Sequence, residues 1–127
     1  MELHNNLKHS ELTKKIIKSY YDVYNSLGYG FLERVYENAM FYELQKKGLI
    51  VERQKSIKVY YKNIVVGNFF ADLVINNSVI VELKAATRLN KEFDIQLVNY
   101  LKATDIEVGL LFNFGNKPEF KRRVNLL

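Results

Sequence analysis

The amino-acid sequence predicts an α/β sandwich built on one mixed β-sheet. Apolar residues recur at helical spacing twice near the start of the chain, and several β-branched and aromatic runs separated by turn residues follow. A third helical stretch then precedes a last continuous apolar run. The expected order is therefore helix, helix, antiparallel meander, helix and strand, which is typical of helices packed on a single sheet.

The helices are expected at about residues 11–27, 31–47 and 90–102. Gly28 and Gly48 are placed to end the first two helices, and Asn90 is placed to cap the third. The second helix carries a predicted apolar stripe made of Leu32, Val35, Tyr36, Ala39, Met40 and Leu44. The first helix carries three tyrosines that are expected to pack in the core and at its rim, with a base-stacking platform as the alternative: Tyr20, Tyr21 and Tyr24.

Extended stretches are expected at residues 50–53, 57–61, 64–66, 69–75 and 79–83, and together they are expected to form a meander of three or four antiparallel strands. Gly67 is expected to mark a bulge or bend within this meander. A covered strand is expected at residues 108–114 and an edge strand at 121–127. Residues 1–127 are expected to form a single domain with a flexible N-terminus over residues 1–10.

Composition narrows the class of protein. The chain has no Cys, which favours a reducing, cytoplasmic location and excludes a thiolate zinc site. It has no apolar run near the roughly 20 residues that span a bilayer, so no membrane partner is expected. The net charge of +5 is compatible with an anionic partner. Both histidines, His4 and His9, lie in the polar N-terminal segment, which argues against a histidine-based catalytic centre.

Charged residues interrupt the apolar hairpin that Asn76-Asn77-Ser78 is expected to close. Glu82 and Lys84 are two residues apart, so a regular strand directs both to one face, where Asp72 of the preceding strand can reach them. Buried charges are unfavourable unless they are paired or bind a metal, and close carboxylates favour a divalent cation. Oxygen ligands favour Mg²⁺ or Mn²⁺ over zinc. The alternative is a half-exposed hairpin whose charges face water.

The segment Leu27-Gly-Tyr-Gly-Phe-Leu-Glu-Arg-Val-Tyr36 resembles the signature of the GxxExxY proteins, a family within the PD-(D/E)xK nuclease superfamily. Gly30, Glu33 and Tyr36 occupy its named positions. The resemblance extends from about residue 15 to residue 127 and includes Val51-Glu-Arg-Gln54, Ala71-Asp72-Leu73, Val81-Glu-Leu-Lys84, Gln96-Leu-Val-Asn-Tyr100 and residues 108–115. Ala71 stands where the superfamily motif nominally has Pro.

This resemblance implies a restriction-endonuclease-like core, a mixed β-sheet flanked by helices, with the acidic hairpin at its centre. The metal-ligand positions correspond to Asp72 and Glu82, with Glu33 and the Leu83 carbonyl as further ligands. The catalytic lysine corresponds to Lys84. An accessory catalytic pair on the following helix corresponds to Gln96 and Tyr100. Basic residues expected to contact nucleic acid, without sequence preference, are Lys55, Lys58, Arg88, Lys91 and Lys102.

The predicted function is therefore a Mg²⁺-dependent (or Mn²⁺-dependent) nuclease, a hydrolase that cleaves phosphodiester bonds in nucleic acid, with DNA favoured over RNA. The alternative is a non-cleaving module of the nuclease fold that binds nucleic acid or a protein partner. Joint retention of Asp72, Glu82 and Lys84 favours the nuclease. The oligomeric state is open, and a homodimer is compatible with the sequence.

Overall fold

The computed structural model of the protein describes residues 9–125, which form three helices and one five-stranded sheet. The elements are α2 (Ser10–Leu27), α3 (Glu33–Lys46), β1 (Val51–Tyr61), β2 (Ile64–Ile75), β3 (Val79–Lys84), α4 (Lys91–Lys102), β4 (Val108–Phe114) and β5 (Pro118–Val124). The strand order is β1-β2-β3-β4-β5. The β3–β4 pair is parallel and the other pairs are antiparallel. The predicted mixed sheet is confirmed.

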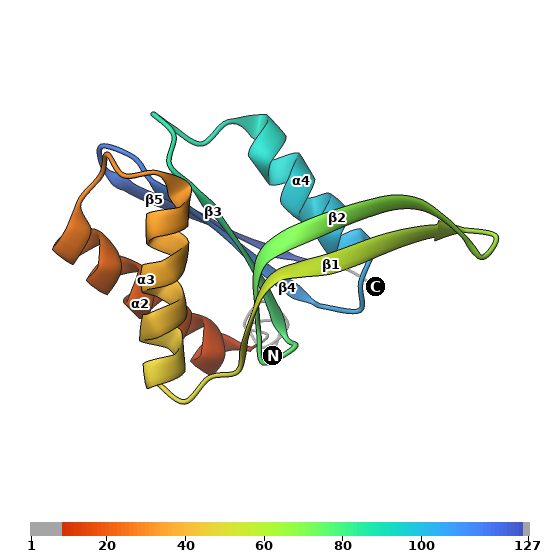
Figure 1. Ribbon diagram of the computed structural model, residues 1–127, viewed down its shortest axis with the longest axis horizontal. Coiled ribbons are helices and arrows are strands. Elements are labelled where there is room, and N and C mark those ends of the chain that lie inside the picture. The colour runs from red at the N-terminus through yellow and green to blue at the C-terminus, as the bar shows by residue number, and fades with distance from the viewer. Residues whose placement is uncertain (1–8, 126–127) are drawn as a thin grey trace, which may run out of the picture.

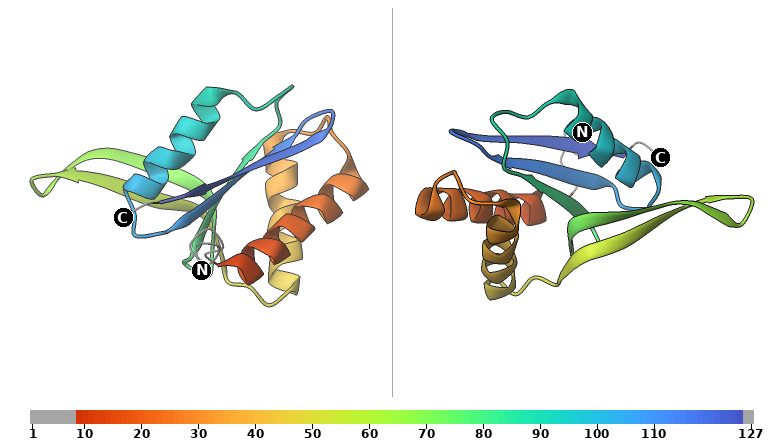
Figure 2. Two further views of the ribbon diagram at one scale, coloured as in Figure 1. Left: turned by 180° about the vertical axis from the view of Figure 1, so that it is seen from behind. Right: turned by 45° about the horizontal axis from the view of Figure 1, so that its top comes forward.

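The helices lie on both faces of the sheet (Figures 1 and 2). On one face, α2 and α3 bury a core that includes Tyr20, Tyr36 and Met40 against β2, β3 and β4. On the other face, α4 buries Leu97 and Leu101 against a second core cluster. The connection through α4 makes the parallel β3–β4 pairing feasible, because parallel strands need a long crossover between them. No helix in the described part of the chain is long and apolar enough to cross a membrane.

The helix ends follow the sequence signals closely. Gly28 ends α2 with a φ of 70°, and the Asn90 side chain accepts a hydrogen bond from the Phe93 N–H at the start of α4. Tyr20 is fully buried, which confirms its packing role. The predicted stripe of the second helix is wrong at its beginning: Leu32 is 82% exposed and Val35 is 37% exposed. Leu32 precedes α3 in extended conformation and does not share the helical periodicity.

The meander contains three antiparallel strands, because β1 and β2 each run without a break. Lys62 and Asn63 form the turn between these strands with positive φ, as Asn76 and Asn77 do between β2 and β3. The pairing register shifts beside Gly67, which confirms the predicted irregularity there. The edge strand β5 begins at Pro118 and ends at Val124, earlier than predicted. Ser10 already belongs to α2, and the rest of the predicted flexible segment that precedes His9 lies outside the described residues.

The outer halves of β1 and β2 extend beyond the body of the protein as a two-stranded arm (Figures 1 and 2). No helix covers the end of this arm in the views of Figures 1 and 2, and its large apolar side chains are exposed to solvent: Tyr60, Tyr61, Ile64, Val65 and Val66. The inner ends of the same two strands carry Gln54 and Asp72. The arm is therefore a continuation of β1 and β2, the two strands at one side of the sheet.

The close approach of α4 to the sheet depends on Gly109. A Cβ at this position would lie 2.6 Å from Leu97 Cδ1, and Leu97 is fully buried. Gly109→Ala is expected to lower the free energy of unfolding by about 1–3 kcal/mol, because the added methyl group overpacks this contact. In a Leu97→Ala background the same change should have little cost, since the space is vacated. Urea unfolding of the four proteins measures the coupling. An equal cost in both backgrounds would contradict the contact.

Candidate active site

The acidic hairpin forms a fork in the sheet at the point where β2 leaves β3. Main-chain pairing between the two strands covers only Leu73–Val81, Val74–Ile80 and Ile75–Val79. Beyond these pairs, side-chain carboxylates replace main-chain carbonyls as hydrogen-bond acceptors. The Asp72 N–H donates to Glu82 Oε2 at 2.9 Å, and the Leu83 N–H donates to Asp72 Oδ2 at 2.8 Å. Each carboxylate replaces a carbonyl that the diverging strand no longer supplies. These two bonds fix both carboxylates beside one another.

Burial and mutual repulsion make this pair of carboxylates easy to protonate. Glu82 is 3% exposed, and burial, with a smaller contribution from the Asp72 charge, raises the pKa of Glu82 to about 8. Burial also raises the pKa of Asp72 above its usual value, although hydrogen bonds from Leu83 and Gln54 oppose the rise. The Lys84 ammonium lowers the pKa of both groups. The single positive charge of Lys84 does not neutralise both carboxylates.

Lys84 lies between this pair and α4. Its Nζ is 3.4 Å from Gln96 Oε1 and 4.8 Å from the centre of the Phe93 ring. Tyr100, one helical turn after Gln96, is buried beneath the fork. Burial and the charges of Glu82 and Asp72 raise the pKa of Tyr100 to about 12, so its hydroxyl stays protonated at neutral pH. The structure thus brings the predicted hairpin residues and the predicted helix pair together.

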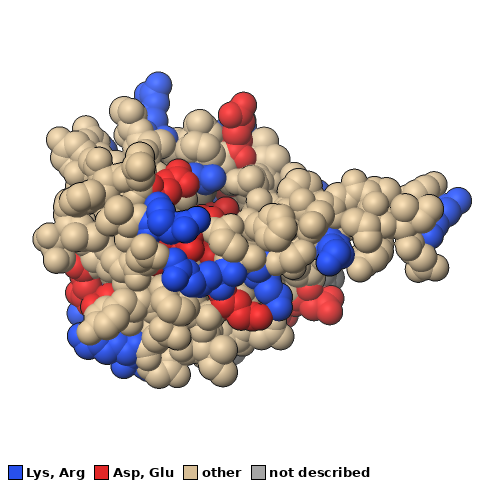
Figure 3. All heavy atoms as spheres, in the orientation of Figure 1, with Lys and Arg blue, Asp and Glu red and all other residues tan. Residues whose placement is uncertain are grey.

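A pocket of about 190 Å³ opens beside Asp72 on the side of α3. Glu33, at the first position of α3, lines this acidic pocket, and its charge contributes to the raised pKa of Glu82. Leu83 also lines it, and ligation by its carbonyl stays a prediction. Figure 3 shows acidic atoms in a hollow near the middle of this face, with Lys and Arg side chains on either side of it.

Two further residues, to which the sequence assigned no site role, also line the acidic pocket. Glu37 is 6% exposed and pairs with Arg53 Nε at 3.1 Å. Gln54 donates from Nε2 to Glu37 Oε1 at 2.8 Å and to Asp72 Oδ1 at 3.2 Å. Gln54 reaches both because its backbone has a φ of 48°, an unusual value inside a strand. The sequence did contain one signal for Glu37: it follows Glu33 by four residues and therefore lies on the same side of the helix.

The donor set agrees in kind with a hard divalent cation. It offers the carboxylates of Asp72 and Glu82, with Glu33, Glu37 and Leu83 lining the adjoining pocket. Among residues 9–125, however, no three His, Cys, Asp or Glu side chains converge closely enough to hold an ion. The residues therefore suit Mg²⁺ or Mn²⁺ bound through two carboxylates with water in other positions, as Mg²⁺ commonly is. Direct ligation by Glu33 stays a prediction.

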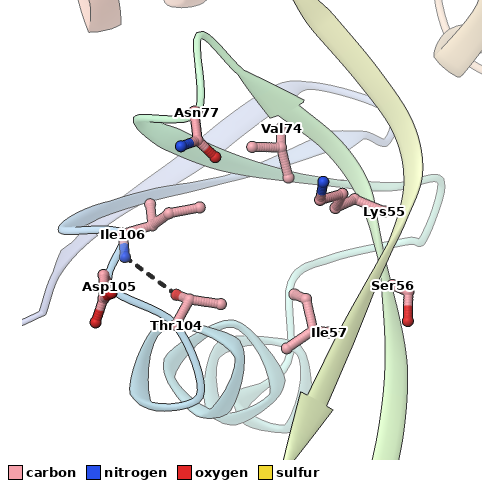
Figure 4. A pocket seen from close by; sticks show the side chains of 8 residues that line it. All are labelled: Lys55, Ser56, Ile57, Val74, Asn77, Thr104, Asp105 and Ile106. Atoms are coloured by element: carbon pink, nitrogen blue, oxygen red, sulfur yellow. Dashed lines mark hydrogen bonds between the residues drawn. The ribbon is translucent and has the colours of Figure 1, made fainter.

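The predicted basic contacts do not gather at the acidic pocket. Lys55 pairs with Glu52 at 2.8 Å and lines a different pocket, between β1 and the end of α4 (Figure 4). Lys58 is exposed on the arm, and Lys102 lines a pocket near the base of the arm. Arg88 and Lys91 are exposed at the other end of α4. The acidic pocket itself is lined by a different cation, Arg34.

Comparison with known proteins agrees with this arrangement. The chain belongs to the PD-(D/E)XK nuclease superfamily, whose family model matches residues 10–123. The narrower GxxExxY assignment stays a prediction. A search among curated proteins found no significant match.

Two solved structures share the fold. The crystal structure of SSO0001 has 16% identity and a TM-score of 0.57, with 75% of this chain and 51% of that chain covered. An alkaline exonuclease from Laribacter hongkongensis has 11% identity and a TM-score of 0.53, with 73% and 55% covered. The chain thus spans about half the length of each. The restriction-endonuclease-like core predicted from the sequence is confirmed.

The raised pKa of Glu82 predicts how the metal-free protein responds to pH. Glu82 stays protonated up to about pH 8 in the folded chain, whereas in the unfolded chain it ionises near 4.5. Its stabilising contribution is full below pH 4.5 and is lost as the pH rises to about 8, with a slope of up to about 1.4 kcal/mol per pH unit. Glu82→Gln in EDTA should remove most of this slope in denaturant unfolding. The surface variant Glu52→Gln should keep it, and equal slopes in wild type and Glu82→Gln would contradict the prediction.

Proposed function

We propose that this protein is a divalent-metal-dependent nuclease that hydrolyses phosphodiester bonds in nucleic acid, DNA ahead of RNA. One observation carries the proposal: the buried Glu82 and the half-buried Asp72 lie side by side at the fork, with Lys84 directed to the same place by its strand position. A buried acidic pair that its neighbours do not neutralise is costly to a fold and common at functional sites. Membership of a nuclease superfamily supports the same conclusion.

Asp72 and Glu82 would hold Mg²⁺ or Mn²⁺, with the Leu83 carbonyl and Glu33 as further ligands. Such an ion, when bound, polarises a phosphate and lowers the pKa of a bound water. Lys84 would stabilise negative charge on the reacting phosphate or position the attacking water, since its ammonium lies between the carboxylates and Gln96. Gln96 and Tyr100 would orient the phosphate or the water from α4, with Tyr100 as a hydrogen-bond donor because its hydroxyl stays protonated.

Cations at the acidic pocket and elsewhere on the surface would add affinity without sequence preference. Arg34 lines the acidic pocket, Lys58 and Lys102 lie on or near the arm, and Arg88 and Lys91 lie at the start of α4. Contacts of this kind go to phosphates and weaken with salt. Lys55 already pairs with Glu52 and lines a separate pocket, so it is less available for this role.

One observation favours the alternative function, a module that binds nucleic acid or a protein partner without cleaving. Within the described residues the carboxylates do not form a cluster of three around one ion position. A protein of this fold whose site fails to bind metal would keep its basic surface and lose hydrolysis. Metal binding and cleavage therefore have to be measured separately.

Metal binding is expected to stabilise the protein through Asp72. At a Mn²⁺ or Mg²⁺ concentration 100-fold above Kd, the free energy of unfolding should rise by about 2.7 kcal/mol, because only the folded chain presents the paired carboxylates. Asp72→Asn should abolish the rise in melting temperature that reports this gain. The matched control is Asp22→Asn, which removes a surface carboxylate paired with Lys18 and should leave the rise intact. The same metal-induced rise in Asp72→Asn would remove the proposed site.

Cleavage is expected to depend on Lys84 more than folding does. Lys84→Met should keep the fold and the metal-induced stabilisation, yet lower the cleavage rate by about 10²–10³, the scale seen when one charge-stabilising donor is lost. Single-stranded DNA, duplex DNA and RNA would each be offered with Mg²⁺ or Mn²⁺, and with EDTA as the metal-free control. Lys18→Met, which removes a surface lysine on α2, should cleave at the wild-type rate. Equal cleavage by wild type and Lys84→Met would show that the activity comes from elsewhere.

A further inference from the structure

A second hollow, which we call the loop pocket, adjoins the acidic pocket. It has a volume of about 500 Å³, within the range of pockets that bind small ligands. Three loops form its walls: the α2–α3 loop, the loop that follows β3, and the β4–β5 turn. The residues that line it are Tyr29, Gly30, Phe31, Leu32, Ala85, Ala86, Thr87, Phe114, Gly115 and Asn116.

The two pockets share two walls. On the α3 side, Leu32 lines the loop pocket and the next residue, Glu33, lines the acidic pocket. On the β3 side, Leu83 lines the acidic pocket and Ala85 lines the loop pocket, with Lys84 between them. Along the chain, the lining residues of the two pockets are therefore only one or two residues apart on each shared wall.

The walls of the loop pocket are held in place before any ligand arrives. The Tyr36 hydroxyl donates to the Gly28 carbonyl at 2.8 Å and accepts from the Phe31 N–H at 3.2 Å. The Tyr36 ring stacks on Phe114, with ring centres 4.0 Å apart. On the opposite wall, the buried Asn113 side chain accepts from the Ala86 N–H at 2.9 Å and donates to its carbonyl at 3.0 Å. Binding in a preformed pocket avoids the entropy cost of ordering it.

The lining is uncharged and partly aromatic. None of the described residues that line the loop pocket is acidic or basic, so it suits neither a phosphate nor a metal. Tyr29 is 62% exposed and Phe31 is 48% exposed, and the polar lining groups are main chain, Thr87 and Asn116. Exposed rings beside uncharged hydrogen-bonding groups are what an unstacked nucleobase binds, by stacking on its face and hydrogen bonding at its edge.

We propose that the loop pocket binds one unstacked base of the substrate, next to the phosphate that is cleaved. This inference rests on the proposed function and narrows its substrate class. A base inside a duplex has both faces stacked and cannot enter, so single-stranded, frayed or flipped nucleotides fit the site. An apolar segment of a protein partner is the other occupant that the same surface could take, and the test below separates the two.

The test combines protein variants with modified substrates. On single-stranded 12-nucleotide DNA and RNA, the double variant Tyr29→Ala/Phe31→Ala should cleave about 5- to 100-fold less efficiently than wild type, the scale of stacking one base. A second set of substrates carries one abasic nucleotide, placed in turn at each position next to the cleaved bond. At one of these positions the missing base should lower the cleavage efficiency of wild type by a similar factor. At the same position the missing base should hardly change cleavage by the double variant, because the aromatic rings that the base would stack on are already absent. Tyr42→Ala, which removes an exposed ring elsewhere on α3, should behave as wild type.

Binding is measured independently of cleavage. With Mg²⁺ and Lys84→Met protein, an oligonucleotide carrying 2-aminopurine at the sensitive position should lose fluorescence through stacking, and the Tyr29→Ala/Phe31→Ala change should prevent the loss. Unchanged cleavage by the folded double variant, or an abasic penalty of equal size in both proteins, would overturn the base-binding pocket while leaving the nuclease in place. If wild type cleaves none of the substrates, the proposed function fails. The fluorescence measurement alone then tests whether the loop pocket binds a base. No loss of fluorescence with any oligonucleotide would leave the protein-segment alternative.

Discussion

The exchange of hydrogen bonds between Asp72 and Glu82 at the fork is the constraint on which the site depends. Where β2 turns away towards the arm, the two carboxylates accept the main-chain N–H groups that would otherwise lose their partners inside the protein. The same bonds end the β2–β3 ladder and align the acids. Burying the two acids opposes folding, as the raised pKa of Glu82 shows, so the surrounding cores must compensate for it.

The segment around Tyr36, which resembles the GxxExxY signature, has a structural role that its sequence alone does not reveal. Gly30 has a φ of 113°, a region that residues with a side chain rarely occupy, and Tyr36 ties the loop before α3 to its own helix. Together they fix where α3 begins, and with it where Glu33 lies beside the acidic pocket. The glycine and the tyrosine of the signature therefore position its acid.

Local patterns predicted most of the fold and part of the site. Helical spacing, terminal glycines and the Asn76-Asn77 turn depend on neighbouring residues, and the alternation of Glu82 and Lys84 follows from strand geometry alone. Glu37 and Gln54 were given no site role because their roles depend on residues distant in the sequence: Glu37 pairs with Arg53 and accepts a hydrogen bond from Gln54. Gln54 adopts a left-handed conformation that its residue type does not demand. The prediction also ended the first strand at residue 53, whereas β1 continues without a break to Tyr61.

The long arm leaves β1 as one edge of the sheet, and this has a consequence for how copies of the protein behave in solution. An open edge with exposed apolar neighbours, such as Tyr61 and Ile64, can pair with the same edge of another chain and start an aggregate. Along β1 and its turn the sequence places Lys55, Lys58 and Lys62, and β5, at the opposite edge, carries Lys121. Because like charges meet when two identical edges approach, these lysines act as gatekeepers against fibre-like assembly.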